Sequence, residues 1–256
     1  MKIHSTAIVD KTAELAAGVE VGPFSIIGEE VKIGDGCKIA SHVLIADGTV
    51  LGKNCQIHHG AVLGTIPQDL KFKGEKTILR LGDNNVVREY ATLNRGTEER
   101  GETTIGSGCL FMAYAHVAHD CVIENNVILA NCVNFAGHVK VGEFAIIGGL
   151  VPVHQFVHVG EHAMIGGGYR VSQDVCPYST VAGNPLKTMG LNLVGLKRRG
   201  FSAEAIRILK QAYKLLFFSN LNTSQALQAI ESKVEATPEV LRLIDFVRKS
   251  ERGITK

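Results

Sequence analysis

Residues 27–39 read IGEEVKIGDGCKI, which places an isoleucine at every sixth position (Ile27, Ile33 and Ile39). The same phase runs from Ile3 to Val171, and Val, Ile, Leu or Phe occupies 26 of its 29 positions. Neither a helical period of 3.6 nor strand alternation produces this spacing. Eleven phase residues are followed directly by glycine, which suits repeated tight corners. A six-residue period of aliphatic and turn-forming residues predicts a parallel β-helix over residues 3 to about 172.

A second row of small or β-branched residues lies two positions before the phase residues. Because alternate residues of a strand face the same side, we expect each short strand to place one large and one small residue in a narrow core. Four of the six cysteines lie in this row: Cys37, Cys55, Cys109 and Cys121. The chain has no CxxC pair, so we expect these four to fill the core in a reducing compartment.

The three exceptions to the phase mark two polar excursions. Asp69 and Glu75 fall in the first, at about residues 65–80, and Glu99 falls in the second, at about residues 95–104. Loops that leave a regular solenoid commonly form its binding face. Tolerated surface insertions are the equally open alternative.

The repeat fails after Pro177, and the sequence predicts a β-helix domain at residues 1–186 and a helical domain at residues 187–256. Ser202 is the predicted N-cap of a first long helix. Thr223 or Ser224 is expected to cap a second helix, and Thr237-Pro238 to open a third.

Charge differs between these two parts. Residues 187–256 contain 13 Lys and Arg against 6 Asp and Glu, whereas residues 1–186 contain 14 against 19. A basic surface can attract phosphates or an acidic protein. Nucleic acid is disfavoured as a partner because no recognition motif accompanies the charge. The most apolar stretch, residues 145–153, is far shorter than the roughly 20 residues of a membrane span. We therefore expect a cytoplasmic protein without stable membrane insertion.

All ten histidines lie outside the two inward rows, so we expect them to face solvent, a loop or another subunit. Four of them fall within 39 residues and could gather on adjacent coils: His116, His119, His138 and His154. A carboxylate follows His119 directly, at Asp120, and a histidine beside a carboxylate can act as a base. The spacing alone leaves three interpretations open, which are catalysis, metal binding and scattered surface histidines.

Five segments resemble the bacterial UDP-N-acetylglucosamine O-acyltransferases, which catalyse the first step of lipid A synthesis. They are AHVAHDC at 115–121, AGHV at 136–139, VHQF at 153–156, PQDLK at 67–71 and GLKRRGF at 195–201. The resemblance covers essentially the whole chain in order. It implies a homotrimer of left-handed parallel β-helices, each with a C-terminal helical domain, and active sites between subunits. It implies no cofactor and no metal.

The same resemblance implies a reaction and its residues. An (R)-3-hydroxyacyl chain passes from acyl carrier protein to the 3-position of UDP-N-acetylglucosamine. His119 matches the general base, Asp120 the residue that orients it, and the Gly137 N–H the donor to the oxyanion. The residues matching the substrate-binding positions are Asp69, Lys71, His116, His138, His154, Gln155, Gly167, Asn192 and Arg199.

Two positions bear on specificity. Gly167 matches the position that sets acyl-chain length in the family, and its missing side chain predicts a long chain. Asn94 departs from the histidine of other members, which leaves a 3-hydroxyl and a 3-amino acceptor both open.

Three other functions remain as alternatives. An N-acyltransferase of the same pathway would carry a separate domain before the repeats, whereas this chain enters the repeat at Ile3. A zinc β-helix of the γ-carbonic anhydrase type would need three well-spaced histidine ligands. A non-enzymatic scaffold would use the repeat only to trimerise.

Overall fold

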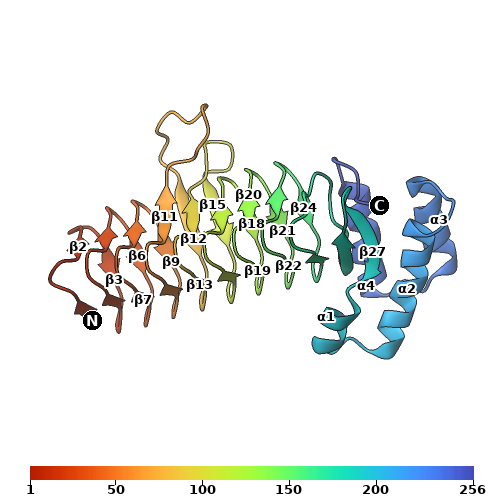
Figure 1. The fold of residues 1–256 in the computed structure, drawn as a ribbon, viewed down its shortest axis with the longest axis horizontal. Coiled ribbons are helices and arrows are strands. Elements are labelled where there is room, and N and C mark those ends of the chain that lie inside the picture. Colours follow the sequence, from red (N-terminus) through yellow and green to blue (C-terminus); the bar gives the residue numbers. More distant parts are fainter.

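Three parallel sheets form the sides of a β-helix that occupies most of the chain (Figure 1). In the computed structural model, which describes residues 1–256, successive strands join sheets A, B and C in turn. Sheet A contains β1 (Lys2–Ile3), β4 (Glu20–Val21), β7 (Lys38–Ile39), β10 (Gln56–Ile57), β13 (Val86–Val87), β16 (Leu110–Phe111), β19 (Ile128–Leu129), β22 (Ile146–Ile147), β25 (Met164–Ile165), β26 (Ser179–Ala182) and β27 (Lys187–Leu191). Sheet B contains β2 (Ile8–Val9), β5 (Ile26–Ile27), β8 (Leu44–Ile45), β11 (Val62–Thr65), β14 (Thr92–Asn94), β17 (His116–Val117), β20 (Asn134–Phe135) and β23 (Pro152–Val153). Sheet C contains β3 (Glu14–Leu15), β6 (Lys32–Ile33), β9 (Val50–Leu51), β12 (Ile78–Leu81), β15 (Glu102–Ile105), β18 (Val122–Ile123), β21 (Lys140–Val141) and β24 (His158–Val159).

One regular coil takes 18 residues, as the pairing of Lys38 with Gln56 shows. Gln56 pairs with Val86 instead, a step of 30, so the first excursion adds 12 residues to its coil. Thr92 pairs with His116, a step of 24, so the second excursion adds 6. Both additions are multiples of six. The hydrophobic phase therefore resumes unchanged after each loop.

Three columns of turns join the sheets, and we call them the A–B, B–C and C–A corners. Most turns hold one residue in the left-handed region two positions before the next strand, such as His42, Asp120 and His162, with φ between 56° and 59°. The glycines that follow phase residues do something else. A Cβ at Gly34 would lie 2.7 Å from the carbonyl carbon of Gly52 on the next coil. Apart from Gly64, which has a φ of 75°, those glycines permit close approach of coils rather than an unusual backbone angle.

The two inward rows fill the core of the β-helix, as predicted. Their residues are almost fully buried from Val19 to Val181. The first coil is the exception, because no coil covers it: Ile3 is 43% exposed, and Val9 and Leu15 are only partly buried. Cys37, Cys55, Cys109 and Cys121 are buried in the small row, and all six cysteines are free. Cys176 is also buried, whereas Cys132 is exposed.

Four helices follow the β-helix and enclose a second hydrophobic core. Ser202 caps α2 (Ala203–Phe217) and Thr237 caps α4 (Pro238–Lys249), as predicted. The predicted cap of α3 (Thr223–Lys233) is wrong. Asn222 takes that role, because its side chain accepts from the Gln225 N–H and Gln225 reaches back in a capping box. The short α1 (Leu193–Arg198) and the antiparallel pair β26–β27 have no counterpart in the sequence prediction.

The two parts share an interface near the predicted division between residues 186 and 187. The second core includes Cys176 and Tyr178 from the repeat side. An Nη atom of Arg242 on α4 lies 3.0 Å from a carboxylate oxygen of Glu161. Buried Asp174 accepts a 2.6 Å hydrogen bond from the Ser250 hydroxyl. None of the helices has the length and apolar character to cross a membrane.

Candidate active site

The B–C corner carries both excursions and a run of polar residues on neighbouring coils. The first loop leaves from β11 and returns at β12, and the second leaves from β14 and returns at β15. Both project from the same side of the β-helix (Figure 1). The later turns of this corner carry His119, Asp120, Gly137 and His138. The coil geometry thus stacks segments that are far apart in the sequence.

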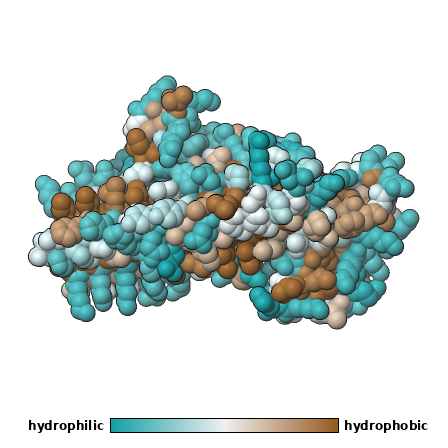
Figure 2. Space-filling view, in the orientation of Figure 1, coloured by the Kyte–Doolittle hydropathy of each residue, from teal (hydrophilic) through white to brown (hydrophobic).

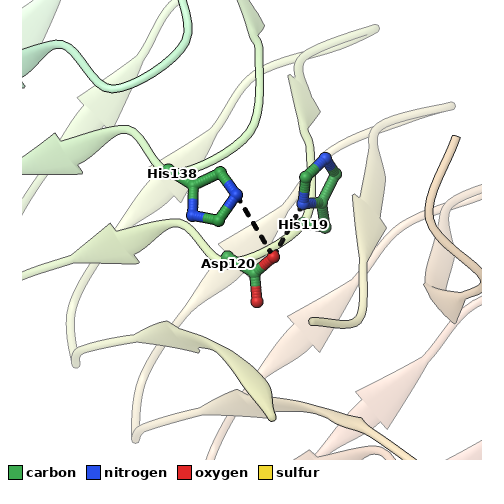
Figure 3. A group of neighbouring side chains, drawn as sticks. All are labelled: His119, Asp120 and His138. Atoms are coloured by element: carbon green, nitrogen blue, oxygen red, sulfur yellow. Dashed lines mark hydrogen bonds and ion pairs between the residues drawn. The ribbon is translucent and has the colours of Figure 1, made fainter. Parts of the chain in front are cut away.

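His119 and Asp120 form a buried pair. The Nδ1 atom of His119 lies 2.7 Å from Oδ2 of Asp120. Adjacent side chains can meet here because Asp120 adopts a φ of 59°, which turns the chain sharply between them. A carboxylate only accepts hydrogen bonds, so Nδ1 carries the proton and Nε2 presents a lone pair. Figure 3 shows Asp120 between the two histidine rings, with His138 Nε2 3.6 Å from the same oxygen.

The Asp120 carboxylate is held from several directions. Oδ1 accepts from the Thr97 N–H at 2.9 Å, and Oδ2 accepts from the Thr97 hydroxyl at 2.7 Å. The backbone N–H of Asp120 donates to the Thr103 hydroxyl at 2.8 Å. Burial alone would raise the pKa of Asp120, but hydrogen bonds from His119 and Thr97 outweigh it and hold the pKa below its ordinary value. Asp120 is therefore an anion at neutral pH.

Gly137 lies directly against the His119 ring. A Cβ at position 137 would sit 2.5 Å from Cε1 and 2.6 Å from Nε2 of that ring. Only glycine fits here without displacing the imidazole. The Gly137 N–H makes no hydrogen bond within the chain. A free backbone donor therefore lies beside the basic nitrogen.

A hollow of about 410 Å³ lies beside this group, and His138 is the histidine that lines it. Asp69, Lys71 and Phe72 of the first loop line one side, and Gln155 and Phe156 line the other. The Asp69 carboxylate comes within 3.9 Å of His119 Nε2. Thr97 and Glu99 of the second excursion also line the hollow, so it brings both excursions together with His138.

Two further predicted histidines lie on sheet B or the B–C corner. His116, on the outer face of β17, bonds through Nδ1 to the Thr92 hydroxyl at 2.7 Å. Burial, followed by the neighbouring His119, lowers the pKa of His116, so it is neutral at neutral pH. His154 is exposed at the next turn of the B–C corner.

Asn192 and Arg199 lie elsewhere, at the two ends of α1 on the C–A corner. The Asn192 side chain caps this helix by accepting from Gly195, and it donates to the His162 carbonyl. The Arg199 guanidinium stacks 4.4 Å above the Phe144 ring. Gly167 is exposed near the A–B corner. Within one chain, the predicted substrate residues thus occupy three different corners.

The sequence prediction missed several residues of this site. Thr97 and Thr103 hold Asp120, Phe156 stacks on His138 with ring centroids 4.5 Å apart, and Glu99 approaches His138 at 3.5 Å. The only available signal was that Thr97 and Glu99 fall in the second excursion. The register of the coils, which brings this loop over Asp120, could not be read from one-dimensional spacing.

His119, Asp120 and His138 also form a group that could hold a metal ion, since their ligand atoms lie within 4.8 Å of one another. Zinc sites of the γ-carbonic anhydrase type need three neutral imidazoles. Here one member is a carboxylate whose oxygens already accept from His119 and Thr97. The donor set therefore fits a hydrogen-bonded base better than a zinc site.

Comparison with known proteins supports the same assignment. The family described as "Udp N-acetylglucosamine O-acyltransferase; Domain 2" matches residues 174–255, and that described as "Bacterial transferase hexapeptide (six repeats)" matches residues 12–47, 30–65 and 102–137. The chain is 47% identical to an acyl-[acyl-carrier-protein]--UDP-N-acetylglucosamine O-acyltransferase of Thermodesulfovibrio yellowstonii, covering 100% of this chain and 99% of that protein.

Solved structures agree over the full length. A UDP-N-acetylglucosamine acyltransferase from Bacteroides fragilis superposes with a TM-score of 0.98 at 43% identity, covering 99% of both chains. A relative from Acinetobacter baumannii gives a TM-score of 0.96 at 44% identity, again over 99% of both chains. The predicted left-handed parallel β-helix with C-terminal helices is confirmed.

Proposed function

Because the chain belongs to the family of the acyl-carrier-protein-dependent UDP-N-acetylglucosamine O-acyltransferases, we propose that its B–C corner is the active site for this transfer. The reaction moves an acyl chain from acyl carrier protein to UDP-N-acetylglucosamine in lipid A synthesis. The observation that carries the site assignment is the buried His119–Asp120 pair with the free Gly137 N–H beside it.

The geometry supports a general-base mechanism. Nε2 of His119 takes the proton of the sugar 3-hydroxyl as its oxygen attacks the thioester carbonyl carbon. The carbonyl oxygen becomes an oxyanion, for which the Gly137 N–H is the donor. Collapse of the tetrahedral intermediate breaks the carbon–sulfur bond. The carrier thiolate then takes the proton from the imidazolium, so the products are the ester and the free carrier thiol.

The flanking residues fit the two substrates. Asp69, Lys71, His116 and His138 are assigned to the sugar and thioester side of the hollow. Arginine, histidine and amide side chains suit a nucleotide diphosphate, which accepts charge-assisted hydrogen bonds. We assign that part to His154, Gln155, Asn192 and Arg199.

A homotrimer would unite these residues, because Arg199 and Asn192 lie on a different corner from His119. Two outer strips are apolar enough to pack against other copies. One is the outer row of sheet B near the N-terminus, where Ile8 and Ile26 are 64% and 44% exposed. Figure 2 shows this row over the N-terminal coils. The other is the A–B corner, where Tyr114 and Leu150 are 61% and 68% exposed. Exposed apolar surface of this extent favours association.

The reaction belongs in the cytoplasm under this proposal. All six cysteines are free, which suits a reducing compartment. The basic helical domain offers a surface for an acidic carrier protein.

Acyl-chain length and acceptor are the finer points. Gly167 is exposed near the A–B corner. Because glycine has no side chain to block the acyl chain there, this position favours a long chain. Asn94 is buried and donates to the carbonyls of Thr65 and Ile66, so it anchors the first loop.

The test is an acyl-transfer assay of the purified protein. The acceptors are UDP-N-acetylglucosamine and its 3-amino analogue, and the donors are hydroxyacyl carrier proteins of several chain lengths. We expect ester formation with the 3-hydroxyl sugar and the longer donors. Activity confined to ten-carbon donors would overturn the chain-length proposal, and activity confined to the amino sugar would make the enzyme an N-acyltransferase. Loss of activity with a chelator, restored by zinc, would favour the metal alternative.

A further inference from the structure

Within the second excursion, Thr97 is the residue that hydrogen-bonds the Asp120 carboxylate. We propose that Thr97 is a positioning residue, which fixes the Asp120 carboxylate so that it can orient His119. The inference rests on the proposed function. It assigns a mechanistic task to a loop that could equally have been a surface insertion.

Thr97 holds both oxygens of the carboxylate. Its N–H donates to Oδ1 at 2.9 Å and its hydroxyl donates to Oδ2 at 2.7 Å. Each of these charge-assisted hydrogen bonds opposes rotation of the carboxylate about its Cβ–Cγ bond, because rotation would break it. The Asp120 side chain is fully buried, so water does not replace either donor.

The loop itself is firmly anchored, which makes Thr97 a rigid clamp. Arg95 donates to the carbonyl of Gly64 at 2.6 Å and to that of Asp47 at 2.8 Å. The Thr77 hydroxyl donates to the Gly96 carbonyl at 2.6 Å. The loop closes on itself where the Gly101 N–H donates to the Thr97 carbonyl at 2.7 Å. Hydrogen bonds to residues of both excursions thus hold the segment that carries Thr97 in place beside Asp120.

The clamp has a chemical consequence for the base. Oδ2 of Asp120 points at His119 Nδ1 at 2.7 Å, which keeps the proton on Nδ1 and leaves Nε2 free for the acceptor hydroxyl. The same Oδ2 lies 3.6 Å from His138 Nε2, so two histidine rings compete for this one oxygen. Loss of the Thr97 hydroxyl should therefore slow the chemical step without weakening substrate binding.

The experiment measures kcat and KM for Thr97→Val, Thr97→Ser and wild type. One hydrogen bond to a charged group corresponds to a fall of about tenfold to a hundredfold in kcat. We expect that fall in Thr97→Val with KM unchanged, and recovery in Thr97→Ser, which keeps the hydroxyl. Thr12→Val is the matched control, because the Thr12 hydroxyl bonds the Asp10 carboxylate at 2.6 Å far from the site. It should leave kcat unchanged.

A double-mutant cycle separates positioning from general support of the fold. In an Asp120→Asn background, Thr97→Val should cause no further loss, because Thr97 acts through that carboxylate. An equal loss in both backgrounds, or unchanged kcat in Thr97→Val, would overturn the proposal. If Thr97→Val folds poorly, Thr97→Ala provides the same cycle. An inactive wild type in this assay would instead count against the proposed function.

Discussion

At the scale of residues, the site depends on close contact between His119, Asp120 and Gly137. His119 and Asp120 are neighbours in sequence and meet because of the left-handed turn at Asp120. Gly137 comes from the next coil and lies against the imidazole. The sequence resemblance pointed to these three residues. It could not show that the glycine is required by the ring as well as by the oxyanion.

Gly137→Ala should therefore impair catalysis by displacing His119. The added Cβ would lie 2.5 Å from the ring, which is too close for any real contact. We expect a large loss of kcat in a folded protein. Gly149→Ala is the control, since Gly149 has the same place in its turn and its Cβ would meet only backbone atoms of Asn131, the nearest at 3.2 Å. Equal activity of the two variants would contradict this account of Gly137.

Acid should weaken the fold partly through Asp120. Its pKa is lower in the folded protein than its ordinary value of 3.8, so the ionised carboxylate stabilises the fold above that pH. The contribution is lost as pH falls below 3.8 toward the lowered pKa. Asp120→Asn does not titrate. The difference in unfolding free energy between wild type and this variant should thus shrink on acidification, and a difference independent of pH would contradict the prediction.

At the scale of elements, the two rows of residues predicted the strands well because every coil repeats the same burial pattern. The excursions were also located, since they interrupt the rows. Their lengths of 12 and 6 extra residues explain why the phase survived them. The glycines after phase residues do lie in the corners, but most of them are needed because a neighbouring coil comes close, and a six-residue pattern cannot show that contact. The cap at Asn222 was missed although the spacing N-x-x-Q at residues 222–225 signals a capping box.

Helix capping gives a measurable test at this scale. The Ser202 side chain accepts from the Ala205 N–H at 3.0 Å, and Ser202→Ala should cost about 1 kcal/mol of unfolding free energy. Ser224→Ala should cost much less, because Ser224 lies inside α3 and caps nothing. Denaturant unfolding followed by helical circular dichroism would compare them. A larger effect at Ser224 would contradict the assignment of the caps.

At the scale of the whole molecule, one chain holds the parts of the proposed site on different corners. His119 lies on the B–C corner, and Arg199 lies on the C–A corner beside Phe144. No pattern in the sequence could show this separation, because the six-residue phase does not say which corner a turn occupies. The separation is the structural reason to expect that copies of the chain assemble. The exposed apolar row of sheet B is a surface on which they could pack.

A charge on that row should prevent assembly and activity together. Ile26 is 44% exposed, so Ile26→Glu places a carboxylate on the surface without disturbing the core. We expect monomers in sedimentation velocity and loss of acyl transfer. Val50→Glu, on the outer row of sheet C, is the matched control and should remain assembled and active. A fully active Ile26→Glu monomer would show that one chain is sufficient.

The most direct test of the central claim is the rate of acyl transfer to UDP-N-acetylglucosamine by His119→Gln, with His4→Gln as the control. His4 is exposed at the far end of the β-helix, and its removal should change nothing. Loss of the base should lower turnover by about 10²–10⁴ while the protein stays folded and assembled. Turnover at the wild-type rate in His119→Gln would contradict the proposed mechanism.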